Sequence, residues 1–250
     1  MSADIPVPAC EVVAHRGDPL AAVENTVASI HRAVLDGATT VEIDVRVTSD
    51  GVPVLLHDET TARIWGRDEP AAEQSAARIA ALSATAPDGS RTSIPTLAEA
   101  LAAAAPARLL IDLPDAACVP PCLEAVSARG ADVPAPAWCG SAAGLLAVRE
   151  GLPEAQIWLS RDDAELPAAR LITALRPRTW NPEHVHVAPA RIAELGELGL
   201  VTTCWTVDDP ARAVELARMG VRGIISNRAA EVRRAVAADR ARTSLHEEES

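Results

Sequence analysis

The sequence contains no lysine, no phenylalanine and no tyrosine, so all 23 of its basic residues are arginine. Any cation that a functional site requires must therefore come from arginine, from protonated histidine or from a bound metal ion. Acidic residues outnumber basic ones and give a net charge of −12, which argues against a surface that binds nucleic acid or an anionic membrane. An anionic substrate would need a local positive centre.

Two further absences concern location and redox chemistry. The N-terminal segment has no charged stretch followed by a long apolar run, and no run of about 18 apolar residues occurs anywhere. We therefore expect a cytoplasmic protein without an integral membrane segment. The five cysteines are an odd number without Cys-x-x-Cys spacing, so they support neither a disulfide framework nor a zinc site. We expect buried thiols.

Short runs of β-branched and apolar residues alternate with segments of helical spacing. This alternation indicates βα units, and 250 residues suit one (β/α)8 TIM barrel, an α/β fold that we expect over residues 1–242. The expected strands number eight, as a closed barrel requires: Val12–His15, Thr40–Val47, Ala107–Leu113, Ala135–Cys139, Gln156–Leu159, Arg178–Asn181, Val201–Thr206 and Arg222–Ser226. The expected helices include Thr26–Asp36, Thr96–Ala104, Ala190–Gly196 and Pro210–Met219.

Three segments depart from this alternation. Gly51–His57 follows the second strand too closely for a crossover helix, so we expect it to return antiparallel as a β-hairpin. Residues 59–95 are loop-like and stand where one barrel helix would be, so we expect a small insertion over the barrel mouth. Residues 243–250 are polar and acidic, and we expect them to form a disordered tail.

Two carboxylates stand out on the second expected strand. Glu42 and Asp44 are two residues apart, so both side chains point to the same face of the strand. If that face is the inside of the barrel mouth, the two carboxylates repel each other and are costly to bury unless a cation lies between them. Oxygen ligands of this kind suit Mg²⁺ or Ca²⁺. The alternative is that both face solvent on an edge strand.

The expected hairpin favours the first interpretation. If its turn is centred between Asp50 and Gly51, the numbers of paired residues sum to 101, which places Asp44 opposite His57. Directly opposed residues have Cβ atoms about 4.5–5.5 Å apart. A slip of one residue would place His57 on the other face.

A second histidine, His15, ends the first expected strand and precedes Arg16 and Gly17. A lone histidine at such a position is often structural. Arg16 offers a cation for phosphate, however, and Gly17 permits close approach of the backbone. Two histidines beside a metal could divide general acid and general base catalysis, since the imidazole pKa of about 6.5 suits both roles.

The remaining candidates are aromatic or imidazole side chains. Trp205 is either a core residue or the wall of a pocket. His184 and His186 alternate in the sequence and could form a metal pair, but a position in a loop or on a strand face is the simpler interpretation.

Taken together, these residues resemble the glycerophosphodiester phosphodiesterase family in both order and spacing. The resemblance extends over nearly the whole chain. It rests on the following motifs: His15-Arg16-Gly17, Glu24-Asn25-Thr26, Glu42-Ile43-Asp44-Val45, Thr48-x-Asp50-Gly51-x-Pro53-Val54, His57-Asp58, Ile94-Pro95-Thr96-Leu97, Trp180-Asn181-Pro182, Trp205-Thr206-Val207-Asp208 and Gly220-Val221-x-Gly223-Ile224-Ile225-Ser226-Asn227-Arg228.

The resemblance implies a TIM barrel that uses one divalent metal ion to hydrolyse a glycerophosphodiester to an alcohol and glycerol 3-phosphate. It implies the following roles: His15 and His57 as the acid/base pair, Glu42, Asp44 and Asp112 as metal ligands, Arg16 and Asn25 as contacts to the phosphate or substrate, and Trp205 as a wall for the glycerol moiety. The expected partner is a small phosphodiester. The resemblance leaves open which histidine is the base, the choice between Mg²⁺ and Ca²⁺, and the oligomeric state.

One departure from the family pattern affects these expectations. The family usually has Glu-x-Lys on the next strand, where this sequence has Asp112-Leu113-Pro114. Losing one charged hydrogen bond to phosphate costs about 1.5–3 kcal/mol, and Arg63 or Arg67 of the insertion could compensate. Two alternatives follow: the same metal/histidine barrel acting on another phosphorylated or lipid substrate, as phospholipase D-like relatives do, or a non-catalytic barrel that binds a phosphorylated ligand.

Overall fold

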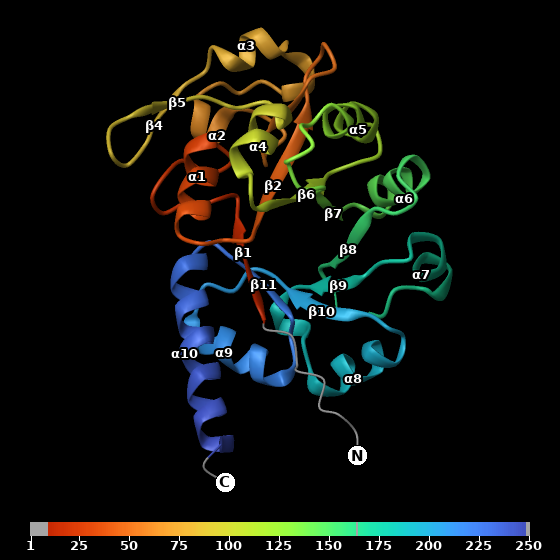
Figure 1. The fold of residues 1–250 in the computed structure, drawn as a ribbon. Helices are drawn as coiled ribbons and strands as arrows, with labels where there is room; N and C mark the ends of the chain where they lie inside the picture. The colour runs from red at the N-terminus through yellow and green to blue at the C-terminus, as the bar shows by residue number, and fades with distance from the viewer. Residues whose placement is uncertain (1–9, 164, 249–250) are drawn as a thin grey trace.

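Eight parallel strands form a closed barrel in the computed structural model, which describes residues 10–163 and 165–248 (Figure 1). Each strand pairs with the next in the order β1, β2, β6, β7, β8, β9, β10, β11, and β11 pairs again with β1. The expected TIM barrel is therefore confirmed. The strands are β1 (Glu11–His15), β2 (Thr40–Val47), β6 (Arg108–Leu113), β7 (Ala137–Gly140), β8 (Gln156–Arg161), β9 (Thr179–Pro182), β10 (Val201–Cys204) and β11 (Gly223–Ser226).

Helices follow the strands and cover the outside of the barrel, with their buried faces on its apolar core. Four of them, α1, α4, α6 and α9, begin at a side chain that accepts from a free backbone N–H group. Thr96, for example, forms a reciprocal capping box with Glu99. Gly220 ends α9 in the left-handed conformation, as expected. The helices are α1 (Val27–Leu35), α4 (Leu97–Ala104), α5 (Val119–Ser127), α6 (Ala142–Gly151), α7 (Ala169–Leu175), the 3-10 turn η2 (His184–His186), α8 (Pro189–Glu197), α9 (Pro210–Met219) and α10 (Ala229–Glu248).

The hairpin that follows β2 is present, but its expected register is wrong by one residue. β3 (Pro53–Leu55) pairs antiparallel with β2 so that Val45 faces Leu55, and the paired numbers sum to 100 rather than 101. The reason is the turn, which is a three-residue loop closed by Thr48. The Thr48 hydroxyl accepts a hydrogen bond from the Val52 backbone, and Gly51 supplies the left-handed φ of 82° that such a loop requires.

The insertion between β3 and α4 forms a small layer with its own apolar core, at the top of Figure 1. Leu56 and Trp65 are buried in that core, which attaches the insertion to the hairpin. It comprises α2 (Ala62–Trp65), the 3-10 turn η1 (Ala71–Glu73), α3 (Ala76–Ala80), β4 (Ala84–Thr85) and β5 (Arg91–Thr92).

The C-terminal segment differs from the expected disordered tail, because α10 continues to Glu248. Residues 229–248 contain neither proline nor glycine and are rich in Ala, Arg and Glu, all of which favour helix. The helix lies against α9, where Arg218 pairs with Asp239 at 2.5 Å. Residues 249–250 lie outside the described residues.

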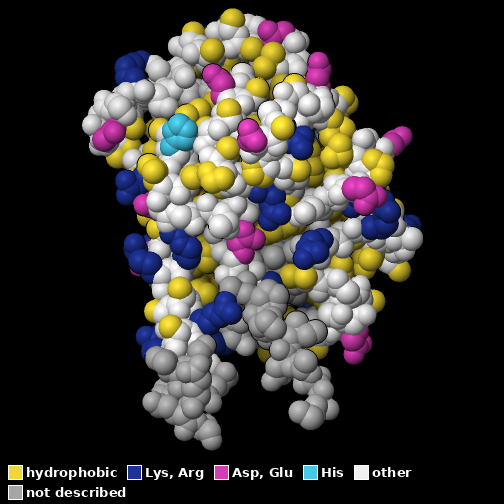
Figure 2. Space-filling view, viewed as in Figure 1, with side chains coloured by type: hydrophobic (Ala, Val, Ile, Leu, Met, Phe, Trp, Pro, Cys, Tyr) yellow, Lys and Arg dark blue, Asp and Glu magenta, His cyan; other side chains and the backbone are white. Residues whose placement is uncertain are grey.

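The surface shows no single dominant patch on the face drawn in Figure 2, where arginine side chains are interspersed with acidic and apolar ones. Within residues 10–163 and 165–248, no helix has both the length and the apolar character needed to cross a membrane.

Candidate active site

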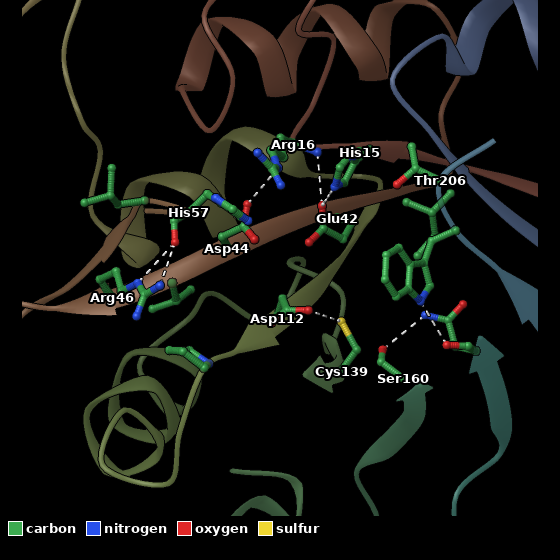
Figure 3. Close-up of a pocket in the computed structure, with 16 residues that line it drawn as sticks. His15, Arg16, Glu42, Asp44, Arg46, His57, Asp112, Cys139, Ser160 and Thr206 are labelled. Atoms are coloured by element: carbon green, nitrogen blue, oxygen red, sulfur yellow. Dashed lines mark hydrogen bonds and ion pairs between the residues drawn. The ribbon is translucent and has the colours of Figure 1, made fainter. Parts of the chain in front are cut away.

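A cavity of about 260 Å³ opens at the carboxyl ends of the barrel strands, and Figure 3 shows the side chains around it. In a parallel barrel, residues at this end come from separate strands and meet above the closed core. The lining comprises His15, Arg16, Glu42, Asp44, Val45, Arg46, Leu56, His57, Asp112, Pro114, Cys139, Ser160, Asn181, Trp205, Thr206 and Ile225. No residue of 59–95, all of which the structure describes, is among them, so the insertion flanks the cavity and does not line it.

Three carboxylates share the floor of the cavity. Asp44 and Asp112 are paired neighbours on adjacent strands, and Glu42 lies on the same face of β2 with only 4% of its surface exposed. Burial first, and then the charges of Asp44 and Asp112, raise the pKa of Glu42 well above its usual value. Burial and Asp44 also raise the pKa of Asp112 from 3.8 to about 6. These carboxylates therefore repel one another in a poorly solvated place.

Arg16 stands beside these carboxylates because its backbone has a left-handed φ of 58°. Its amide donates to the Glu42 carboxylate at 3.1 Å. Its Nη1 donates to Glu24, and its Nε lies 3.1 Å from Asp44 Oδ2 as an ion pair without hydrogen-bond geometry. Gly17 follows with a φ of 85°, and a Cβ there would lie 2.5 Å from the backbone of Ser29. Only glycine fits this corner without displacing α1.

Asn25, expected as a phosphate or substrate contact, lies behind Asp44 and does not line the cavity. Its Nδ2 donates to Asp44 Oδ2 at 2.7 Å, and its Oδ1 accepts from the Asp44 backbone at 3.1 Å. The side chain is buried and clamps Asp44 in a fixed orientation. In this structure it positions a carboxylate.

His15 is held by a chain of hydrogen bonds from the last strand of the barrel. Its Nδ1 lies 2.8 Å from Asn227 Oδ1, and Asn227 Nδ2 donates to Asp208 at 2.8 Å. Its Nε2 faces the Glu42 carboxylate at 3.8 Å. Burial, followed by the charge of Arg16, lowers the pKa of His15. The neutral imidazole is therefore favoured near neutral pH.

His57 reaches the same cavity although the expected pairing with Asp44 is wrong. It lies two residues beyond the end of β3, where the alternation of strand side chains no longer applies. Its Nδ1 is 2.8 Å from Asp58 Oδ1, and its carbonyl accepts two hydrogen bonds from Arg46. Partial burial raises the pKa of Asp58, but bonds from Arg63 and His57 outweigh it and lower the pKa overall.

Trp205 lines the cavity, with its indole Nε1 donating to the Asn181 carbonyl at 3.0 Å. Asn181 and Ser160 lie beside it and are joined by a 3.2 Å hydrogen bond. His184 and His186 lie in η2 and do not line the cavity. The five cysteines are free, and four of them are buried.

Two partners were not identified as site residues from the sequence alone, Asn227 and Asp208. Both belong to the motifs that follow β10 and β11, and polar residues directly after barrel strands are the signal that could have identified them. Neither Arg63 nor Arg67 lines the cavity. Arg63 pairs with Glu24 and Asp58, and Arg67 lies 3.6 Å from Glu69.

The donor set of Glu42, Asp44 and Asp112 suits a hard divalent cation, which would relieve the repulsion that raises the pKa of Glu42 and of Asp112. Within residues 10–163 and 165–248, no three His, Cys, Asp or Glu side chains are already arranged around a common ion. Asp44 is held by Arg16 and Asn25, while Cys139 Sγ lies 3.5 Å from Asp112. Ion binding would therefore reorient these carboxylates.

The raised pKa of Asp112 predicts a pH dependence of stability in the presence of a chelator. The folded chain holds this proton more tightly than the unfolded chain. The ionisation of Asp112 therefore costs no folding stability below about pH 4 and its full destabilisation is present above about pH 6. We expect the stability of the wild type, relative to Asp112→Asn, to fall over this range by on the order of 2 kcal/mol. Urea unfolding of both proteins at pH 4 and pH 7 measures this change. If their free energies of unfolding differ by the same amount at both pH values, the prediction is wrong.

A closed parallel barrel that gathers histidines and carboxylates at the carboxyl ends of its strands has the architecture of a TIM-barrel enzyme. Residues 15–231 match the model of the Glycerophosphoryl diester phosphodiesterase family, and the chain belongs to this family of phosphoric diester hydrolases.

Individual relatives agree with this membership. Human glycerophosphodiester phosphodiesterase 1 is 46% identical over 70 residues, which cover 23% of this chain and 21% of that protein. Human glycerophosphoinositol inositolphosphodiesterase is 50% identical over 60 residues, covering 24% of this chain and 11% of that protein. The structure of an Oleispira antarctica phosphodiesterase in complex with its product sn-glycerol-3-phosphate has a TM-score of 0.83 at 23% identity and covers 90% of this chain and 96% of that one. At that identity the likeness concerns the fold.

Proposed function

We propose that this protein hydrolyses a glycerophosphodiester to an alcohol and glycerol 3-phosphate by acid/base catalysis between His15 and His57. The observation that carries the proposal is that one cavity contains two histidines with different partners, one on each side of a carboxylate cluster. A neighbouring hydroxyl of the glycerol moiety would attack phosphorus and expel the alkoxide. Hydrolysis of the resulting cyclic ester would then yield glycerol 3-phosphate.

His15 is the general base in this proposal. Ionised Asp208 can only accept hydrogen bonds, so the NH₂ group of Asn227 must face Asp208 and its Oδ1 must face His15. The Nδ1 of His15 then carries the proton, and Nε2 keeps a free lone pair in the neutral ring. The lowered pKa of His15 favours that neutral ring, which takes the proton of the attacking hydroxyl on Nε2.

His57 is the general acid. Asp58 has a pKa lowered overall by Arg63 and His57, so its carboxylate stays charged and accepts from Nδ1 of His57. A carboxylate partner stabilises the imidazolium, whereas the amide partner of His15 offers no charge. With Nδ1 of His57 held by Asp58, we assign Nε2 the delivery of a proton to the leaving alkoxide.

Glu42, Asp44 and Asp112 would hold one divalent metal ion, Mg²⁺ or Ca²⁺. When bound, the ion would supply the positive charge that offsets the phosphoryl oxygens. Arg16 and Asn25 hold this cluster in place, because both contact Asp44. We retain Arg16, which lines the cavity, as a phosphate contact.

The size of the cavity bears on the alternative substrates. About 260 Å³ accommodates a glycerol phosphate but cannot enclose a diacyl lipid, and this favours the small diester over a phospholipase D-like substrate. A cytoplasmic location and a single domain over residues 1–242 remain our predictions from the sequence.

The test is release of glycerol 3-phosphate from glycerophosphocholine and glycerophosphoethanolamine with Mg²⁺, with Ca²⁺ and with chelator. We expect release with at least one of the ions and none with chelator. A folded protein that binds the metal but releases glycerol 3-phosphate from neither substrate would exclude the proposal. In that case the non-catalytic interpretation would gain support.

A further inference from the structure

Arg46 differs from Arg16, the other arginine that lines the cavity, in its hydrogen-bond partners. Arg16 is enclosed by Glu24 and Asp44, whereas Arg46 contacts no carboxylate within the described residues. Its Nε and Nη2 donate to the carbonyl of His57 at 3.2 and 2.7 Å. A hydrogen bond to a neutral carbonyl oxygen does not compensate the charge of the guanidinium group. This charge is therefore available to an anion.

Arg46 and Pro114 follow a pair of carboxylates on neighbouring strands and line the same cavity. Asp44 pairs with Asp112; Arg46 lies two residues further along β2 and Pro114 directly follows the end of β6, and both line the cavity. The short ring of Pro114 carries no charge and leaves Arg46 as the cation at this edge. In Figure 3, Arg46 lies at one end of the cavity and Thr206, which follows Trp205, at the other.

A second cavity of about 350 Å³ begins at the same arginine. It lies between the end of β2, the insertion and the segment that follows β6. Arg46 belongs to the linings of both cavities. The second lining comprises Arg46, Val47, Thr48, Glu59, Pro70, Ala71, Ala72, Asp115, Ala117 and Cys118.

We propose that Arg46 binds the phosphodiester anion at the junction of these two cavities, and that the second cavity receives the alcohol that the reaction releases. This inference rests on the proposed function, because it assigns the two arms of the same substrate. The glycerol arm extends toward Trp205, the phosphate meets Arg46, and the alcohol arm extends past Arg46.

The placement of the histidines agrees with this orientation. His57 lies on the Arg46 side, with its own carbonyl held by that arginine, and His15 lies toward Thr206 (Figure 3). The proposed acid thus stands where the alcohol leaves, and the proposed base stands where the glycerol hydroxyl attacks. One substrate orientation satisfies both histidines and both cavities.

The second cavity also indicates a class of alcohol. It contains two carboxylates, Glu59 and Asp115, and neither pairs with an arginine or histidine among the described residues. Asp115 accepts a backbone bond from Cys118 at 3.1 Å. If Arg46 binds the phosphate, the two carboxylates are the remaining charges of the second cavity. They favour a cationic alcohol such as choline or ethanolamine over a neutral polyol.

The proposed binding of the phosphate by Arg46 is tested by measuring the affinity for intact glycerophosphocholine in a His57→Ala background, in which turnover is slowed. Adding Arg46→Gln should weaken the affinity by about tenfold to hundredfold, the worth of one charged hydrogen bond. Adding Pro114→Lys to that variant should restore most of it, since a lysine there reaches the same edge. If Arg46 only orders the carbonyl of His57, the lysine will restore nothing, and the proposal fails. This test decides whether Arg46 binds the phosphate even if the wild type proves inactive.

The subsite is tested on active protein by the ratio of kcat/KM for the choline ester to that for the methyl ester of glycerol 3-phosphate. Ala117→Leu, which fills the second cavity, should lower this ratio about tenfold. Glu59→Gln should lower a second ratio by about threefold, that of kcat/KM for the choline ester to kcat/KM for the glycerol ester of glycerol 3-phosphate. This is the effect expected for one exposed charge pair. Glu73→Gln, an exposed carboxylate outside the lining, is the matched control. Unchanged ratios in a protein that hydrolyses all three esters would overturn the subsite and leave the proposed function intact.

Discussion

Replacing His57 with alanine is expected to lower kcat for glycerophosphocholine by about 10²–10⁴-fold, the usual contribution of a positioned acid or base. The same change should have a much smaller effect on the p-nitrophenyl ester of glycerol 3-phosphate, because p-nitrophenolate leaves without being protonated. His15→Ala should slow both substrates alike, since both need the hydroxyl of glycerol to be deprotonated. Initial rates of the two variants on the two substrates measure this pattern.

This comparison separates the two histidines, which a single loss of activity would not. Their partners differ in charge, since Asn227 holds His15 and Asp58 holds His57. If His15→Ala instead slows glycerophosphocholine strongly and the p-nitrophenyl ester only slightly, His15 is the acid and the two roles are reversed. His31→Ala, an exposed residue of α1, is the control for loss of an imidazole.

Replacing Glu42 with glutamine is expected to abolish metal-dependent activity and, with chelator present, to raise the melting temperature above that of the wild type. The carboxylate is 4% exposed and is repelled by Asp44 and Asp112, so the neutral amide removes an unfavourable charge. In the wild type, saturating metal should offset that repulsion. At about 100 times Kd, binding contributes roughly 2.7 kcal/mol, or about 5–10 °C for a chain of this size.

The measurement is thermal unfolding of the wild type and of Glu42→Gln with Mg²⁺, with Ca²⁺ and with chelator. Glu73→Gln, an exposed carboxylate of the insertion, should respond to the ions as the wild type does. If both ions stabilise Glu42→Gln as strongly as they stabilise the wild type, Glu42 is not a ligand. Comparison of the two ions also shows which one the site prefers.

Much of the fold could be predicted from patterns of neighbouring residues in the sequence. Alternation of apolar runs with helical segments predicted all eight barrel strands to within a few residues, and the glycine that ends α9 marked its boundary. These features depend on residues close together in the chain. The polar, acidic end of the chain has the composition of a solvated tail, but its Ala, Arg and Glu residues also favour helix, and α10 continues to Glu248.

The site was accessible in part, for the same reason. The strand alternation correctly placed Glu42 and Asp44 on one face, and the motif around His15 placed it at a strand end. The partner of His57 was predicted wrongly, because one residue in a turn changes the register of a whole hairpin. Asn25 lies in the right neighbourhood but contacts Asp44, a distinction that spacing does not contain.

The sequence by itself determined the α/β class, the barrel, and the gathering of two histidines with carboxylates at one end of it. Strand and helix periodicity is local, and the closed barrel brings the ends of its strands together at one rim. Only the tertiary structure decided which groups meet at that rim: Asn227 with His15, 212 positions apart in the chain, and Arg46 at the junction of two cavities. Such pairs depend on how distant strands align and how loops close, and no local pattern encodes that alignment.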